Sequence, residues 1–426
     1  MAVKALKGFK DIIPGEVETW QFIEQTARSI FHRFTFSEIK VPVLEKTKLF
    51  TRSIGETTDI VEKEMYTFPD RNGSSLTMRP EGTAPVLRAY IENGLHAVKP
   101  VQKLYTIGPM FRHERPQKGR LRQFHQMSVE VLGEDNPLLD AEVMAMAWQI
   151  MKELGLTASL EINSLGCKEC RPDFNRALLD FLDKANGLCD DCVRRRETNP
   201  LRVLDCKSSN CQEQYVQAPS ILDFLCGGCD EHFKAVKNGL DMLSVPYKVN
   251  SFMVRGLDYY TRTTFELVTS DLGAQSAVGA GGRYDGLVKQ LGGPDVPGIG
   301  FAMGVERLAL LLDQLGKGVH SNGIDLFIAA LGPEAQKKAF VLMNVLRGKG
   351  LSVSMDLMDR SLKNQMKQAG KAEASYVLIV GEQELANGEA VLRNMETHDQ
   401  HQIAIKEAVK MWHEDLATFF ATETTK

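Results

Sequence analysis

The residues with the clearest capacity for chemistry lie in the polar stretch between Phe111 and Gln126. Five arginines and lysines and two histidines stand there against one acid: Arg112, His113, Glu114, Arg115, Lys118, Arg120, Arg122 and His125. Guanidinium groups bind phosphate oxygens in bidentate fashion, whereas a lysine ammonium acts as a point charge. The stretch therefore indicates a site for a nucleotide or a nucleic-acid backbone. Taken alone, the stretch favours a solvated, charged hairpin loop over such a site.

Two further segments suit a small charged substrate. Arg79-Pro80-Glu81-Gly82-Thr83 puts a carboxylate and a hydroxyl on a turn, which predicts either an ammonium site or an ordinary helix N-cap. The segment RGLDYYTR, from Arg255 to Arg262, combines a permanently charged guanidinium with the aromatic walls of Tyr259 and Tyr260. Its alternative is a turn followed by a strand with tyrosines in the core.

Glycines gather in residues 279–286 (GAGGRYDG) and 298–308 (GIGFAMGVERL). They allow a base or a phosphate to approach the backbone closely, and Arg307 stands near the start of an expected helix. No GxxxxGK[ST] pattern occurs, so this is not a Walker A loop. A flexible glycine loop before a core helix is the alternative.

All eight cysteines fall within one stretch of about 60 residues and form four pairs: Cys167/Cys170, Cys189/Cys192, Cys206/Cys211 and Cys226/Cys229. Paired thiolates outside a secreted protein indicate zinc first, and four pairs could close two tetrahedral sites. The alternative is a set of reduced core thiols in a variable insert. Spacing alone does not assign the ligands.

The composition bounds the class of protein. At 426 residues the chain is long enough for two or three domains. Its net charge of −4 argues against a protein that coats polyanions nonspecifically, because such a protein needs a strong basic excess. The N-terminal segment lacks an apolar signal core, and no stretch reaches the roughly 18 apolar residues of a membrane span. We therefore expect a cytoplasmic protein without a membrane segment.

Apolar periodicity predicts the elements that must position these residues. We expect helices over Thr19–Phe34, from Gly82 or Thr83 to Asn93, and over Leu138–Leu154, and strands over Ile39–Leu44, Ser75–Met78, Leu104–Phe111 and Phe124–Leu132. The last two strands should be antiparallel, and Pro42 makes Ile39–Leu44 an edge or interface strand. After a linker, a βαβ pattern follows: strands Asp325–Ala330, Leu351–Met355 and Tyr376–Val380 alternate with helices Glu334–Arg347 and Ser361–Gly370.

In this order, the segments PMFRHERPQKGRLRQFHQ and RGLDYYTRTTFE, with the glycine-rich pair, resemble class II aminoacyl-tRNA synthetases, specifically the histidyl-tRNA synthetase family of bacterial type. The resemblance covers nearly the whole chain, except the cysteines. It implies an α+β fold: a catalytic domain on an antiparallel sheet, an inserted helical domain and a C-terminal α/β anticodon-binding domain. The implied divisions are 1–166 and 250–313 for the catalytic domain, 167–249 for the insert, 314–323 for a linker and 324–426 for the last domain.

The resemblance also implies the reaction. Histidine's carboxylate would attack the α-phosphate of ATP, release pyrophosphate and form histidyl-adenylate, and tRNA(His) would then take the histidyl group and release AMP. Phosphoryl-type transfer depends on positioning and charge stabilisation, so arginines should dominate. By resemblance, Arg112 binds the α-phosphate, Arg255 stabilises its pentacoordinate form, Arg307 binds the far phosphate and Arg120 adds a nucleotide contact.

The same resemblance assigns the amino-acid pocket. Glu81, Thr83 and Gln126 match residues that hold the α-ammonium group. Glu130 and Tyr260 match the pair that binds the two imidazole nitrogens, and Tyr259 and Tyr284 would line the pocket. Such a pocket rejects phenylalanine and asparagine, since each leaves buried polar groups unpaired.

Partners follow in the same way. The loop Glu114–Gly119, with Arg115, Gln117 and Lys118, matches the part that meets the tRNA acceptor end, and Val41–Thr51 with Pro42 matches a dimer-building motif, so we expect a homodimer. Arg360, Lys363, Lys367 and Lys371 form one stripe of an expected helix, which predicts either tRNA phosphate contacts or a solvated face. Mg²⁺ should accompany ATP, and structural Zn²⁺ in the insert is left open.

Two rival functions remain for comparison. A noncatalytic regulatory subunit or histidine sensor related to the family would be expected to lose catalytic arginines and the last domain, and this chain keeps Arg112, Arg255 and Arg307. A zinc-dependent nucleic-acid-binding protein would account for the cysteines but gives Glu81 and Glu130 no role.

Overall fold

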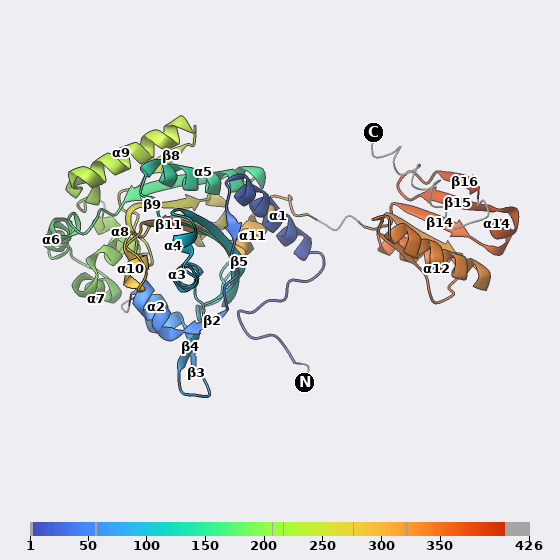
Figure 1. The fold of residues 1–426 in the computed structure, drawn as a ribbon, viewed down its shortest axis with the longest axis horizontal. Coiled ribbons are helices and arrows are strands. Elements are labelled where there is room, and N and C mark those ends of the chain that lie inside the picture. Colours follow the sequence, from blue (N-terminus) through green and yellow to red (C-terminus); the bar gives the residue numbers. More distant parts are fainter. Residues whose placement is uncertain are drawn as a thin grey trace. The chain divides into compact units, whose positions relative to one another are not determined.

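The computed structural model describes residues 3–404 except 56–57, 207, 216, 276 and 320–322. The chain divides into two units, residues 1–320 and 321–426 (Figure 1). Residues 405–426 of the expected last domain and 320–322 of the expected linker lie outside the described residues.

An eight-stranded sheet organises the first unit. Its strand order is β1-β5-β6-β11-β10-β9-β7-β8, and the pairing is antiparallel except at β1–β5 and β7–β8. The strands are β1 (Ser37–Glu38), β5 (Gln102–Phe111), β6 (Gln123–Leu132), β7 (Ser159–Ser164), β8 (Tyr247–Val249), β9 (Thr261–Val268), β10 (Ala277–Arg283) and β11 (Gly298–Gly304). The predicted antiparallel hairpin is thus confirmed as β5–β6, with Gly108 opposite Gln126.

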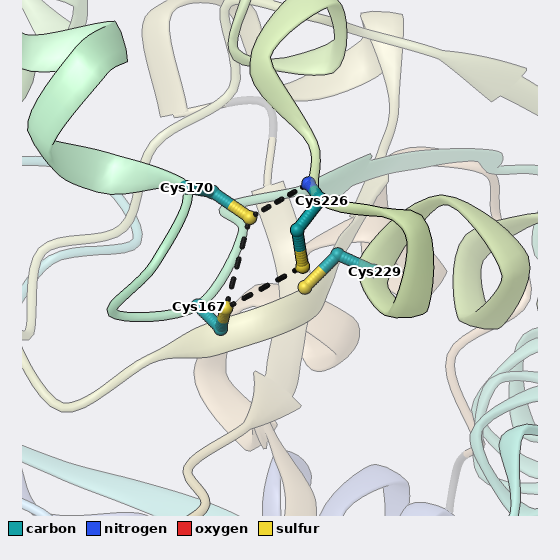
Figure 2. Close-up of side chains that lie close together, drawn as sticks. All are labelled: Cys167, Cys170, Cys226 and Cys229. Atoms are coloured by element: carbon teal, nitrogen blue, oxygen red, sulfur yellow. Dashed lines mark hydrogen bonds between the residues drawn. The ribbon is translucent and has the colours of Figure 1, made fainter.

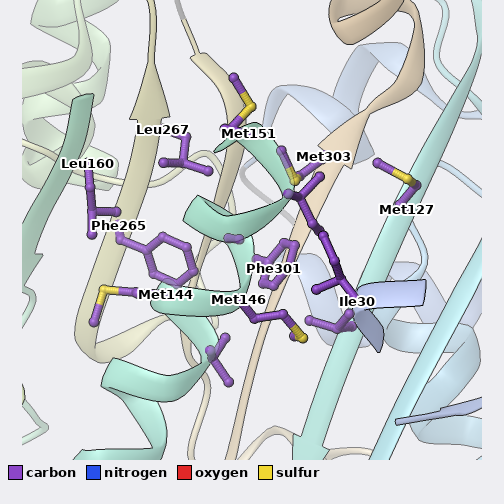
Figure 3. Packing of buried hydrophobic residues seen from close by; sticks show 14 of the residues in the cluster. Ile30, Met127, Met144, Met146, Met151, Leu160, Phe265, Leu267, Phe301 and Met303 are labelled. Carbon is purple, nitrogen blue, oxygen red and sulfur yellow. The ribbon is translucent and has the colours of Figure 1, made fainter. Parts of the chain in front are cut away.

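Strand alternation separates a core face from a polar face of this sheet. On β6, Met127 and Val129 belong to the core, whereas Gln126 and Ser128 point to the other side. Helices α1 (Val17–Arg33), α5 (Pro137–Glu153), α9 (Gly227–Met242) and α11 (Val305–Gln314) contribute to that core. Figure 3 shows methionines of α5 beside Phe265 and Phe301, whose rings lie 6.2 Å apart edge to face.

The smaller elements of this unit confirm most predictions and correct one. They are α2 (Thr47–Ile54), η1 (Ile60–Glu64), α3 (Thr83–Glu92), α4 (Leu95–Val98), η4 (Ser270–Gln275), α10 (Leu287–Gln290) and a three-stranded sheet of β2 (Leu44–Lys46), β4 (Ser75–Met78) and β3 (Tyr66–Pro69). The predicted strand Ile39–Leu44 is wrong, because only Leu44 joins a ladder. Pro42 has no N–H to donate to a neighbouring strand. The buried guanidinium of Arg79 donates a hydrogen bond to the Val41 carbonyl oxygen at 2.9 Å, so this oxygen is not paired with a strand.

The glycine-rich segments form strands β10 and β11, so the flexible-loop alternative is wrong for them. A Cβ at Gly281 would lie 2.2 Å from the Gly300 carbonyl oxygen on the paired strand. Glycine is therefore required by close strand packing at this point.

The segment between β7 and β8 is mainly helical and has its own small core. It contains α6 (Arg171–Leu182), α7 (Asp190–Thr198), η2 (Pro200–Asp205), α8 (Ser209–Tyr215), η3 (Ile221–Phe224) and α9, drawn in green in Figure 1. Helix α9 packs on α5, where His232 Nε2 lies 2.9 Å from the buried Asp140, which also accepts from Arg283 at 2.8 Å. Since β8 belongs to the large sheet, the insert begins and ends on that sheet; its expected bounds of 167–249 stay a prediction.

The second unit contains the predicted βαβ pattern. Its sheet order is β13-β12-β14-β15-β16, with β13, β12 and β14 parallel. The elements are β12 (Leu326–Ala330), α12 (Pro333–Arg347), β13 (Val353–Met355), α13 (Leu362–Lys371), β14 (Tyr376–Val380), α14 (Glu382–Asn387), β15 (Glu389–Asn394) and β16 (Gln400–Ala404). Arg360 precedes α13 and pairs with Asp356 at 2.8 Å, so the predicted four-residue helical stripe is wrong in that member.

In the described part of the chain, no helix combines the length and the apolarity that crossing a membrane requires. The α+β fold class is as expected, with an antiparallel-rich sheet in the first unit and a mixed sheet in the second.

Candidate active site

A pocket of about 400 Å³ opens on the polar face of the large sheet. Ten of the predicted site residues line it: Glu81, Thr83, Arg112, Arg120, Gln126, Arg255, Tyr259, Tyr260, Tyr284 and Arg307. They come from the Arg79–Thr83 turn, the β5–β6 hairpin, the segment before β9, the end of β10 and the start of α11. The fold therefore brings together residues that are more than 200 positions apart in the sequence.

Glu130, the other residue predicted for the amino-acid pocket, is not among the residues that line the cavity, and only 1% of its surface is exposed. It lies directly behind the lining residues Thr83, Tyr284 and Gly300. Its Oε1 accepts a hydrogen bond from the Thr83 hydroxyl at 2.7 Å, and its Oε2 accepts one from the Tyr284 hydroxyl. Gly300 is its neighbour in register on β11, and a Cβ there would lie 2.2 Å from Glu130 Oε2. Glycine at position 300 thus leaves the space that the carboxyl group occupies.

The buried position changes the acidity of this group. Burial raises the pKa of Glu130 to about 8, although the hydrogen bonds from Tyr284 and Thr83 lower it in part. A carboxyl group that exchanges its proton near neutral pH, next to phenolic hydroxyls, suits a ligand with a polar N–H and a nitrogen lone pair.

Glu81 forms the predicted helix cap and also lines the pocket. Its carboxylate accepts the backbone N–H groups of Thr83 at 2.6 Å and Ala84 at 2.8 Å, so it caps α3. The same carboxylate lines the pocket, and burial raises its pKa. The cap fixes the side chain in the direction of the pocket and leaves it able to accept from a ligand.

Three arginines converge at the other side of the pocket. Arg112 donates from Nε to the Pro80 carbonyl at 2.8 Å and stacks over the Phe124 ring at 5.3 Å. Arg120 pairs with Glu114, and Arg307 donates from Nε to the Gly119 carbonyl at 3.4 Å. Burial, together with the charges of Arg120 and Arg112, lowers the pKa of Arg307. Clustered, partly buried cations of this kind favour a polyanion such as a triphosphate.

Arg255 lines the same pocket. It pairs with Glu266 on β9, and its guanidinium carbon lies 5.4 Å from the centre of the Tyr260 ring. Burial lowers the pKa of Arg255, but the charge of Glu266 together with the contributions of Tyr260 and Tyr259 leaves the pKa raised. Its Nε is buried and finds no hydrogen-bond partner among the described residues, and the same is true of Gln126 Oε1. Both residues line the pocket, so a ligand there can supply the missing partners.

The aromatic rings of the pocket pack against one another in tilted and edge-to-face arrangements. The rings of Tyr259 and Tyr260 lie 4.6 Å apart, and Tyr259 meets Tyr284 edge to face at 5.8 Å. Burial raises the pKa of all three phenols, so they stay protonated and can donate hydrogen bonds.

The predicted tRNA-contacting residues lie elsewhere. Three of them lie exposed in the β5–β6 connection and do not line the pocket: Arg115, Gln117 and Lys118. Within this connection, Gln117 forms an isolated β-bridge with Arg120. Lys363 and Lys367 are exposed on α13 in the second unit, and Arg360 precedes that helix.

Several pocket residues were missed by sequence reasoning: Glu114, Asp205, Glu266 and Glu306. Glu266 could have been found from strand alternation, because Phe265 and Leu267 on either side of it are core residues. No periodic pattern in the sequence marks the other three residues as part of the pocket. Asp205 belongs to the insert, and Glu306 accepts a hydrogen bond from the distant His125 backbone N–H at 2.8 Å.

The eight cysteines form two tetrads, Cys167/Cys170/Cys226/Cys229 and Cys189/Cys192/Cys206/Cys211. Within each tetrad, the four Sγ atoms lie within 4.8 Å of one another. Among the described residues of the insert, these two groups could each hold a metal ion. Figure 2 shows the first tetrad.

A pocket on an antiparallel sheet, with converging arginines and a carboxylate–tyrosine group, joined to a βαβ-containing second unit, defines a class II aminoacyl-tRNA synthetase. Comparison with known proteins agrees: the family model described as histidyl-tRNA synthetase matches residues 8–308, and the one described as an anticodon binding domain matches residues 325–414. The chain belongs to the histidyl-tRNA synthetase family.

Individual relatives agree over nearly the whole chain. It is 60% identical to the histidine–tRNA ligase of Desulfotalea psychrophila over 95% of this chain and 94% of that protein. It is 59% identical to the histidine–tRNA ligase of Geobacter sulfurreducens over 95% of this chain and 97% of that protein. The crystal structure of apo S. aureus histidyl-tRNA synthetase superposes with a TM-score of 0.81 at 37% identity, covering 97% of this chain and 100% of that one.

Proposed function

We propose that this chain ligates L-histidine to tRNA(His) in two steps at the pocket on the large sheet. The carboxylate oxygen of histidine attacks the α-phosphorus of ATP, and the bond from that phosphorus to pyrophosphate breaks. A ribose hydroxyl of the terminal adenosine of tRNA then attacks the histidyl carbonyl, and AMP leaves. One observation carries the proposal: the buried carboxylate of Glu81, three tyrosines and a set of converging arginines line one cavity.

In this proposal, the carboxylate side binds histidine. Glu130 and Tyr260 hold the two imidazole nitrogens, while Tyr259 and Tyr284 line the ring. Glu81, Thr83 and Gln126 hold the α-ammonium group, which would supply the partner that Gln126 Oε1 lacks. The raised pKa of Glu130 supports its part, since the group can match the protonation state of an imidazole near neutral pH.

The arginine side binds ATP. Arg112 holds the α-phosphate, Arg120 adds a nucleotide contact and Arg307 holds the far phosphate. Arg255 stabilises the charge that develops on the α-phosphate, with Glu266 fixing its guanidinium and its buried Nε available to the phosphate.

Mg²⁺ accompanies ATP in this proposal. Carboxylate oxygens are its preferred protein ligands, usually one or two together with the substrate phosphates. Glu114 and Glu266 line the pocket and fit that pattern. There the cation would neutralise phosphate charge.

The tRNA would be bound at two places. Arg115, Gln117 and Lys118, on the exposed β5–β6 connection, would meet the acceptor end, and Lys363 and Lys367, with Arg360 before α13, would contact phosphates near the anticodon. Of these three residues, Arg360 has the least support as a tRNA contact, because its guanidinium already pairs with Asp356. We also propose a cytoplasmic homodimer, with Val41–Thr51 at the interface, and the domain division expected from the sequence.

Pyrophosphate–ATP exchange with each standard amino acid in turn tests the function. Exchange that depends on histidine alone supports the ligase. Histidine binding without any exchange would instead favour the regulatory subunit or histidine sensor, which the ligase relatives at 59–60% identity do not favour.

A further inference from the structure

The two cysteine tetrads are nested rather than sequential. The first and last pairs along the chain, Cys167/Cys170 and Cys226/Cys229, meet in one tetrad. The two inner pairs, Cys189/Cys192 and Cys206/Cys211, form the other within the loop that the first tetrad closes. Figure 2 shows the first tetrad, in which thiols from the turn before α6 and from the start of α9 point toward one another.

The sulfur separations match a single four-coordinate ion. Cys167 Sγ lies 3.7 Å from Cys170 Sγ and 3.8 Å from Cys226 Sγ, and Cys189 Sγ lies 3.7 Å from Cys206 Sγ. A tetrahedral Zn²⁺ with Zn–S bonds of about 2.3 Å separates its sulfurs by roughly 3.8 Å. A disulfide would need about 2.05 Å, and all eight cysteines are free.

Backbone amides complete both sites. In the first tetrad, the N–H of Glu169 points to Cys167 Sγ at 3.4 Å and that of Cys226 to Cys170 Sγ at 3.2 Å. In the second, the N–H of Cys189 points to Cys211 Sγ at 3.3 Å and that of Ser208 to Cys206 Sγ at 3.4 Å. Amide N–H groups directed at sulfur compensate the negative charge of metal-bound thiolates.

We propose that each tetrad binds one structural Zn²⁺. We also propose that the two ions hold in place both ends of the segment 256–262, which contains Tyr259 and Tyr260. Four protein ligands close each site, so neither ion keeps an open position for substrate. The metal sites stand on the cysteine geometry alone. Their link to the pocket rests on the proposed function.

The first tetrad connects to the end of that segment. Arg171 directly follows Cys170, and its guanidinium donates to the Leu165 carbonyl at 3.3 Å and to the Tyr260 carbonyl. The Gly166 carbonyl accepts from the Thr261 hydroxyl at 3.0 Å and from the Arg262 N–H at 2.9 Å. The backbone around Cys167 and Cys170 is thus hydrogen-bonded to the backbone at and just after the two tyrosines.

The second tetrad connects to the beginning of the segment. Arg202 lies on η2, between Cys192 and Cys206, and donates to the Gly256 carbonyl at 2.6 Å. Asn199 donates to Asp258 Oδ1 at 3.2 Å, and Arg202 Nε lies 3.5 Å from the same oxygen. Arg171 and Arg202 are therefore positioning residues, which act on the tyrosines through the backbone.

Metal analysis of the full-length chain, purified without chelators, tests the sites first. We expect two zinc ions per chain and X-ray absorption from four sulfur ligands at about 2.3 Å for each. Fewer than two zinc ions, bound iron, disulfides among these cysteines, or nitrogen or oxygen in the shell would overturn the proposal. This measurement needs no variant and no activity.

Two matched quadruple variants test the nested pairing. C167S/C170S/C226S/C229S removes one tetrad and should retain one zinc ion per chain. C167S/C170S/C189S/C192S breaks both tetrads and should retain none. The reverse result would mean that neighbouring pairs bind together, which contradicts the structure. If either variant does not fold, the sulfur coordination of the native chain still decides whether two four-thiolate sites exist.

The link to the pocket is tested with the two arginines. Arg171→Ala and Arg202→Ala should keep two zinc ions but raise KM for histidine in pyrophosphate exchange roughly ten- to a hundredfold, with partial rescue by lysine. The controls Arg176→Ala and Arg194→Ala change exposed arginines on α6 and α7 that pair with Asp173 and Asp191. Equal effects in both sets would overturn the positioning role. Absent exchange in the native chain would refute the proposed function and leave the zinc result intact.

Discussion

The hydroxyl of Thr83, in the first turn of α3, donates to Oε1 of Glu130 on β6 at 2.7 Å. This bond joins the turn expected to hold the α-ammonium group of histidine to the carboxyl group expected to hold its imidazole. Both halves of the proposed amino-acid site therefore depend on one contact between a helix and the sheet.

Thr83→Val keeps the shape of the side chain but removes the donor to Glu130. An unpaired buried acceptor costs about 1–3 kcal/mol, so KM for histidine in pyrophosphate exchange should rise roughly ten- to a hundredfold. Thr83→Ser, which keeps the hydroxyl, should stay within a few-fold of the native chain. An unchanged KM in the valine variant would show that the contact does not support histidine binding.

Glu130→Gln should change how stability depends on pH. The folded-state pKa of Glu130, about 8, exceeds the ordinary value of 4.5, so the folded chain holds more protons between these values. The contribution of Glu130 to stability is complete below pH 4.5 and falls as pH rises to about 8, by at most about 5 kcal/mol.

Calorimetry of native and Glu130→Gln chains across this interval measures the effect, because the contributions of other groups cancel in the difference. The glutamine variant should gain stability relative to the native chain as pH rises. A difference that stays constant with pH would show that Glu130 does not titrate with a raised pKa.

Arg255→Ala should lower the maximal rate of pyrophosphate exchange roughly 100- to 1,000-fold, because it removes charge stabilisation at the α-phosphate. The equilibrium affinity for histidine, measured without ATP, should change much less. Arg176→Ala, an exposed arginine on α6, is the control. Loss of histidine binding with an unchanged exchange rate at saturation would refute the assigned role.

Gly300→Ala should destabilise the chain and weaken histidine binding. Its Cβ would lie 2.2 Å from Glu130 Oε2 and 2.3 Å from the Val129 carbonyl oxygen, so the sheet or the carboxyl group must move. Gly370→Ala is the matched control, because a Cβ there meets no atom within 4 Å on helix α13. Thermal unfolding should separate the two, and equal midpoints would contradict the close packing.

Lys363→Glu with Lys367→Glu should raise KM for tRNA in aminoacylation and weaken its salt dependence, since phosphate contacts release counterions. Lys337→Glu with Lys338→Glu makes the same charge change on α12 of the same unit and serves as the control. If both double variants raise KM equally, net charge and not a specific α13 contact would be responsible.

The sequence predicts the elements best where side chains alternate or repeat. The β5–β6 hairpin, Ser75–Met78 and the βαβ pattern were all predicted, because burial on one face leaves a clear period. The residues 279–286 and 298–304 carry too few side chains to show that period, so their strands were not recognised. Ile39–Leu44 has an apolar pattern, but the Arg79 side chain donates a hydrogen bond to the Val41 carbonyl oxygen, which would otherwise pair with a neighbouring strand.

Site residues were predictable where a family resemblance covered them. Arg112, Glu81 and Tyr260 line the pocket as expected, yet nothing in the sequence shows that Asp205 reaches it from the insert. Likewise, the four cysteine pairs are visible in the sequence, but which pairs meet depends on where α6 and α9 begin in space. Arg360 fitted a helical stripe in sequence and instead pairs with Asp356.

The decisive experiment for the ligase reaction is to incubate the purified chain with ATP, L-histidine and a tRNA(His) transcript and then to analyse the products. We expect one pyrophosphate and one AMP to be released per histidyl group on the terminal adenosine of tRNA, and histidyl-adenylate to be held on the protein when tRNA is omitted. Histidine bound at the pocket with neither pyrophosphate nor charged tRNA formed would contradict this expectation.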